Sequence, residues 1–130
     1  MSIRATLLRR SPVYDVAAKL QRAGIKAVDI RLREDDIPVG DLRRRVIRAV
    51  IVTNEDAFTV GEDRYPTLFK PGDVLNSTMR GVQRNNVLRQ ALQAVTVLER
   101  RGIQTLSVDR KSVDEVEQEL GIVRPGIERR

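Results

Sequence analysis

Carboxylates are the side chains of this sequence best able to bind a metal ion, because its 130 residues include no histidine and no cysteine. Five of them lie close together along the chain: Asp29, Glu34, Asp35, Asp36 and Asp41. Such ligands suit magnesium or manganese, and a two-metal nuclease needs several carboxylates that converge on one point. Their spacing matches no metal motif, so the sequence favours a solvated acidic turn and leaves a magnesium-dependent nuclease as the last alternative.

Other catalytic chemistry has even less support in the sequence. Without histidine or cysteine, neither a Ser-His-Asp triad nor a Cys-His pair can form. The sequence also contains no phosphate-binding glycine loop, dinucleotide fingerprint, nucleophile elbow or zinc spacing. We therefore predict a protein that is not an enzyme and that needs no cofactor.

Arginine dominates the charge of the chain, which has a net charge of +6. Only four of its 24 basic residues are lysine, so the remaining 20 are arginine. Arginine binds carboxylates and phosphates bidentately, which favours an anionic partner, although a coding bias would give the same excess. Only four residues are aromatic, too few for a base-stacking platform. The candidate contacts for nucleic acid or another anion are Arg43, Arg44, Arg45, Arg48, Arg80 and Arg84.

Two of these arginines share one face of the long helix predicted from about residue 76 to 101. Arg80 and Arg84 are four residues apart, in line with the apolar stripe that continues through Leu88 and Val95. We expect both guanidinium groups to emerge without a partner at the rim of a sheet, beside the helix N-terminus. Overhang into solvent is the alternative to anion binding at this place.

Apolar residues outside the expected core suggest protein contacts. Arg48 interrupts the valine face of a predicted central strand, and a buried unpaired charge would cost several kcal/mol. We therefore expect that face to meet solvent or another protein rather than the core. Three residues form a second apolar patch on the long helix. The candidate interface residues are Val46, Val50 and Val52 on the strand, and Met79, Val82 and Val97 on the helix.

The elements that must position these residues follow from the hydrophobic periodicity. A period of two predicts strands at 1–9, 27–33, 45–53, 57–60, 64–69 and 103–108, with 57–60 and 64–69 forming a hairpin around 61–63. A period of 3.6, with glycines after the last turns, predicts helices at 12–23, 76–101 and 113–120. The polar segment 34–41, which contains Pro38 and Gly40, is predicted to be a turn.

A short internal sequence similarity, here called the echo, supports the prediction of the fold. Segments 20–28 and 98–106 both contain the end of a helix, a glycine and the start of a strand. Two β-α-β halves in one chain predict an α+β fold: a ferredoxin-like split β-α-β sandwich with an inserted hairpin and an extra C-terminal helix. A generic mixed sheet is the alternative. We expect a single domain over 1–122 and an extended C-terminal tail over 123–130.

These observations favour a non-enzymatic assembly subunit. It would be homo-oligomeric, or part of a nucleoprotein or virion-like particle, and would use its arginine-rich and valine-rich surfaces. The alternative is a nucleic-acid-binding regulator that contacts phosphates through the arginines. The expected partners are copies of itself or other protein subunits, with nucleic acid possible and no membrane. Neither a signal peptide nor an apolar run of about 18 residues is apparent, so we expect a cytoplasmic or particle-associated location.

Overall fold

The computed structural model describes residues 12–63, 67–72 and 77–121, which form a mixed α+β fold with one sheet. The predicted strand at 1–9 and the tail at 123–130 lie outside the described residues. In chain order the elements are α2 (Val13–Arg22), β1 (Ala27–Val39), β2 (Leu42–Val52), β3 (Ala57–Glu62), β4 (Thr67–Phe69), α3 (Ser77–Arg100), β5 (Gln104–Val108) and α4 (Val113–Leu120).

The sheet has the order β3-β2-β1-β5, and β4 also pairs with β2. Strand β2 is central, as its run of β-branched residues predicts, and its neighbours run antiparallel to it. Strand β5 is parallel to β1. The α+β prediction is confirmed, but the ferredoxin-like topology is not. A ferredoxin-like order would place a strand that precedes α2 beside β5, whereas β1, which follows α2, lies there.

The predicted acidic turn at 34–41 is wrong, because these residues extend a long hairpin. Strand β1 continues to Val39 and β2 begins at Leu42, so only Gly40 and Asp41 form the loop. The φ angle of 60° at Gly40 suits a two-residue hairpin turn. Two of the acidic residues are stabilised in the strand by arginines of β2, since Asp36 forms an ion pair with Arg45 and Asp35 with Arg48.

The predicted hairpin between 57–60 and 64–69 is also wrong, since β3 and β4 both pair with the same side of β2. Strand β3 pairs with its second half and β4 with its first, so they form one interrupted strand. The ladder slips by one residue near Val60, and the backbone NH of Asp63 donates to the carbonyl of Ile47. Segment 61–63 is therefore an irregular part of an edge and does not reverse the chain.

The two echoed segments lie side by side. Gly24 and Gly102 have φ angles of 74° and 76°, and both helix ends are closed by the same pair of backbone hydrogen bonds. The NH of Ile25 donates to Leu20 and that of Ile103 to Leu98. The strands that follow are the parallel pair β1 and β5. The echo thus marks two helix-to-strand junctions that pack against each other.

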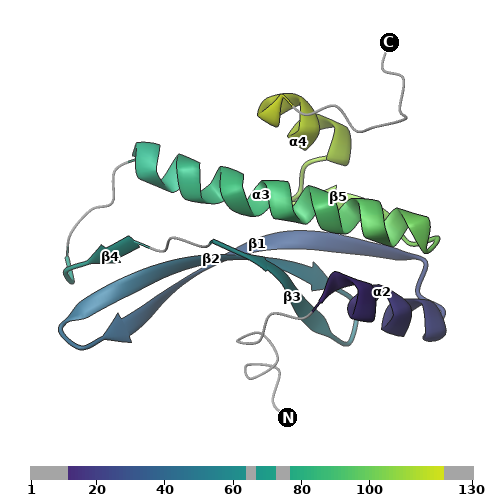
Figure 1. Cartoon of the computed structure of the whole chain (residues 1–130), viewed down its shortest axis with the longest axis horizontal. Helices are drawn as coiled ribbons and strands as arrows, with labels where there is room; N and C mark the ends of the chain where they lie inside the picture. Colours follow the sequence, from purple (N-terminus) through teal and green to yellow (C-terminus); the bar gives the residue numbers. More distant parts are fainter. Residues whose placement is uncertain (1–11, 64–66, 73–76, 122–130) are drawn as a thin grey trace.

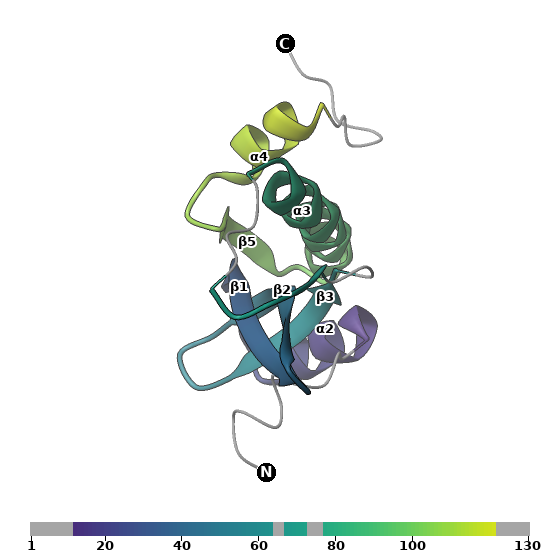
Figure 2. The same cartoon turned by 90° about the vertical axis from the view of Figure 1, so that its left-hand side faces the viewer.

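Helices α2 and α3 cover one face of the sheet, and α4 lies on the far side of α3 (Figures 1 and 2). The core between these layers joins Ile30 and Ile51 of the sheet to Leu20, Val95 and Leu98 of the helices. No helix among the described residues is long and apolar enough to span a membrane.

Candidate functional site

The two faces of β2 have different surroundings. Alternate side chains of a strand point to opposite faces, and Ile47, Ala49 and Ile51 belong to the core beneath the helices. The other face, here called the helix-free face, carries Val46, Arg48 and Val50. The expectation that this face meets solvent or a partner is wrong for these three residues, because they are only 1%, 5% and 4% exposed.

The burial of Arg48 is possible because Asp35 lies beside it. The Nη1 atom of Arg48 lies 2.8 Å from Oδ2 of Asp35, whose carboxylate is also 3.4 Å from Nε of Arg33. The argument that an unpaired arginine could not be buried holds, but this arginine is paired. Its Nε remains buried without a hydrogen-bond partner. The side chain is therefore a structural cation and is not available to phosphates.

The same helix-free face becomes exposed toward the tip of the hairpin. In the register, Arg44 lies between Ile37 of β1 and Leu68 of β4, and Leu42 pairs with Val39. Leu68 and Val39 are 54% and 45% exposed, Arg44 is exposed, and the other two are partly exposed. Paired residues project from the same side of a sheet. These five residues therefore make one surface, the distal patch.

The remaining predicted anion contacts separate into paired and unpaired groups. Arg45 lies 3.4 Å from Asp36 and its guanidinium stacks 6.0 Å from the ring centre of Phe69. Arg84 forms an ion pair with Asp109, so the expectation that it lacks a partner is wrong. Within the described part of the chain, Arg43, Arg44 and Arg80 form no ion pair.

The predicted helix patch does not form one surface. Val97 is buried and belongs to the core. Val82 is 58% exposed, and the side chain of Met79 lies outside what the structure describes. Val52 is half-buried and belongs to a different surface, the hollow described below.

The five candidate metal ligands do not converge. Asp35 and Asp36 are neighbours on a strand, so they point to opposite faces, where arginines bind them. Asp29 accepts a hydrogen bond of 2.8 Å from Ser107. No group of three carboxylates among the described residues could hold a metal ion. Asp29, Asp35 and Asp36 are thus engaged in contacts within the sheet.

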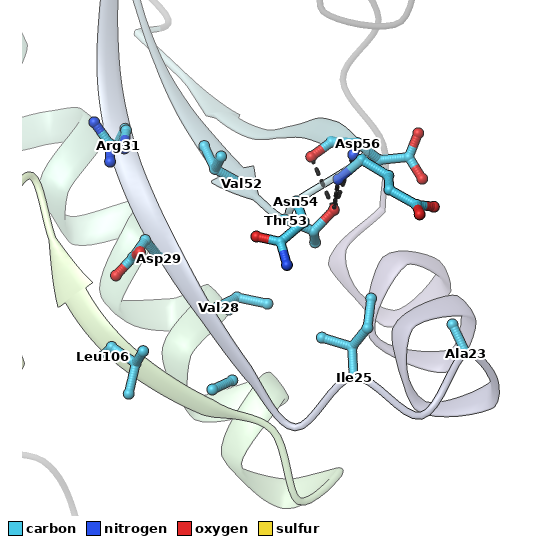
Figure 3. Close-up of a pocket in the computed structure, with 12 residues that line it drawn as sticks. Ala23, Ile25, Val28, Asp29, Arg31, Val52, Thr53, Asn54, Asp56 and Leu106 are labelled. Carbon is cyan, nitrogen blue, oxygen red and sulfur yellow. Dashed lines mark hydrogen bonds between the residues drawn. The ribbon is translucent and has the colours of Figure 1, made fainter.

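Sequence reasoning missed a hollow of about 570 Å³ around the start of β1 (Figure 3). Its apolar lining includes Ile25, Val28 and Leu106, of which Leu106 is 55% exposed. Its charged lining is Asp29, Arg31, Glu55 and Asp56. The β2–β3 turn lies on one side of β1 and Leu106 of β5 on the other. No motif could reveal this site, because its walls come from three separate segments of the chain.

The comparisons with known proteins identify no relative. No family model matches the chain, and searches of curated proteins and of solved structures found no match either.

Proposed function

We propose that the protein is a non-enzymatic assembly subunit that associates with a second copy of itself through the distal patch. The observation that carries the proposal is the contrast along one face of β2. Val46, Arg48 and Val50 are buried, whereas Arg44, with Ile37 and Leu68 on either side, is open to solvent.

The composition of the distal patch supports a protein partner. It joins aliphatic side chains to one central arginine, and arginine is among the residues enriched at interfaces. Three other large hydrophobic residues are as exposed in the described chain, and they are scattered over other elements: Tyr14, Val82 and Leu106. Clustered rather than scattered apolar exposure is what marks a docking surface.

A second copy suits this surface because the patch carries its own complement. Asp41, in the hairpin turn, is exposed and lies one residue before Leu42 and three before Arg44. A two-fold contact brings the same patch from both subunits together. In such a contact, Arg44 of each copy can pair with Asp41 of the other while Leu68 and Val39 are buried.

Substitution of Leu68 with serine tests the proposal. Loss of a buried leucine at the contact should weaken dimerisation by about tenfold or more. Val82→Ser is the matched control, because Val82 is equally exposed but lies on α3 outside the patch. Light scattering over a range of concentrations should show wild-type self-association that Leu68→Ser weakens and Val82→Ser does not. A wild-type monomer at all concentrations would disprove self-association.

The second candidate is binding of nucleic acid, which is favoured by the unpaired state of Arg43, Arg44 and Arg80. Phosphate contacts would make the affinity for a DNA or RNA duplex fall steeply with salt. Replacement of all three by glutamine should then reduce the salt dependence, whereas Arg22→Gln, on α2, should not. Absence of salt-dependent binding by the wild type would eliminate this candidate.

A further inference from the structure

The hollow at the start of β1 has an excess of negative charge on a chain that is positive overall. Three acidic residues, Asp29, Glu55 and Asp56, line it against one basic residue, Arg31. None of these four groups forms an ion pair within the described residues. Its volume of about 570 Å³ is in the range of ligand sites. The hollow therefore suits an occupant that is both aliphatic and cationic.

The backbone of the turn that carries Glu55 and Asp56 is held by hydrogen bonds to Thr53. Oγ1 of Thr53 accepts hydrogen bonds from the backbone NH groups of Asp56, at 2.9 Å, and Glu55, at 3.4 Å. The NH of Thr53 donates to the carbonyl of Asp56 at 2.9 Å. Figure 3 shows Thr53, Asn54 and Asp56 together beside the apolar lining of the hollow, here called the apolar floor. A turn whose backbone is already ordered loses little backbone entropy when it binds a ligand.

The composition of the C-terminal tail is the complement of this lining. Residues 123–130 contain three arginines and one glutamate, against three acidic residues and one arginine that line the hollow. Val123 and Ile127 supply the aliphatic side chains that the apolar floor would bury. Arginine also pairs with carboxylates bidentately.

We propose that the hollow binds the C-terminal tail, residues 123–130, of a second copy of this chain. This proposal rests on the assembly function proposed above, to which it adds a head-to-tail contact. The tail follows α4, which lies beyond α3, whereas α2 borders the hollow at the opposite side of the molecule (Figures 1 and 2). A neighbouring copy can present its tail to the hollow without any segment crossing α3.

A synthetic peptide of residues 123–130, carrying a fluorophore, tests this proposal by anisotropy with the full chain. We expect saturable binding that Glu55→Gln together with Asp56→Asn weakens by roughly five- to tenfold. Leu68→Ser should leave peptide binding unchanged, and a peptide of scrambled sequence should bind more weakly than the native one. No binding, or equal binding by the wild type and the Glu55/Asp56 variant, would overturn the proposal. The two proposals are tested separately. If the peptide does not bind but Leu68→Ser weakens self-association, the distal patch is still supported and only the hollow–tail contact is refuted.

Mixing two variants tests whether the contact forms between copies. One variant carries Glu55→Lys and Asp56→Lys, and the other carries Arg124→Glu, Arg129→Glu and Arg130→Glu, both in the Leu68→Ser background. Each alone should be monomeric, because its hollow and its tail repel each other. Their mixture should form a heterodimer, in which the intact hollow binds the intact tail. A mixture that remains monomeric while each variant folds would refute the contact between copies.

Discussion

The two halves of the helix-free face of β2 carry similar residues but have opposite surroundings. In the half of β2 farther from the hairpin tip, Val46, Arg48 and Val50 are buried, and the arginine has a carboxylate partner. Toward the hairpin tip, Leu42 and Arg44 are at least partly exposed, and the arginine is unpaired among the described residues. Alternation along a strand determines on which face a side chain lies, but not whether that face is covered.

Register explains part of the difference. Arg48 lies between Arg33 of β1 and Glu62 of β3, and Val50 lies between Arg31 and Thr59. The long side chains among these neighbours, Arg31, Arg33 and Glu62, can lie across such positions and cover them. At the distal end, Arg44 has aliphatic neighbours, and among the described residues Leu42 pairs only with β1. Burial of the arginine therefore depends on the residues opposite it.

Arg48→Ala should have the largest effect on stability. Removal of Arg48 deletes a buried cation and leaves Asp35 with only the longer contact to Arg33. Because Asp35 stays partly exposed, we expect a loss of about 2–4 kcal/mol, around the lower end of the range for broken buried ion pairs. Urea denaturation followed by circular dichroism, at a concentration where the chain is monomeric, measures the free energy of unfolding.

Arg44→Ala is the matched control for the distal half. It should change the free energy of unfolding by less than about 0.5 kcal/mol, as is usual for exposed positions without partners. Equal losses from the two substitutions would show that the distal arginine is structural, and the contrast between the halves would then be wrong.

Gly61→Ala should have the next largest effect, because β3 approaches α3 closely there. A Cβ atom at Gly61 would lie 3.0 Å from the Cβ of Gln90 and 3.2 Å from that of Ala49. The amide of Gln90 also exchanges hydrogen bonds of 2.9 and 2.8 Å with the backbone NH and carbonyl of Glu62. We expect a loss of about 1–3 kcal/mol from this overpacking, measured by the same urea denaturation.

Gly81→Ala provides the opposite expectation. Nothing lies within 4 Å of a Cβ placed at Gly81, and the residue is in α3. Alanine should therefore stabilise the helix by about 0.5–1 kcal/mol. A loss at Gly81 similar to that at Gly61 would mean that general disturbance of α3, rather than close packing, explains both results.

The sequence predicts the elements that local rules control. The helix ends at Gly24 and Gly102 and the cap at Ser112, whose Oγ accepts from the NH of Glu115, agree with the structure. Pairing between distant segments could not be predicted, because periodicity does not say which strand lies beside which. The prediction of a turn at 34–41 is wrong for this reason, since Asp35 and Asp36 form ion pairs with Arg48 and Arg45, which follow later in the chain. The hollow could not be predicted from the sequence either, since its walls meet only in the folded chain.

The smallest expected difference separates Arg84 from Arg80, which the sequence treats as equivalent. Arg84, partly buried, forms an ion pair with Asp109, whose backbone NH donates to the carbonyl of Ile30 at 2.7 Å. That pair links α3 to the turn after β5, and partly exposed pairs contribute up to about 1 kcal/mol. Arg84→Ala should therefore lower the free energy of unfolding by up to about 1 kcal/mol, whereas Arg80→Ala, at an exposed position, should stay within about 0.5 kcal/mol. Asp109→Asn should reproduce most of the loss, and Arg84→Ala combined with Asp109→Asn should lose less than the sum of the two. If the losses of free energy from the two single substitutions add up in the double variant, the ion pair does not contribute to stability. The N-terminal part of α3 would then be held by other contacts.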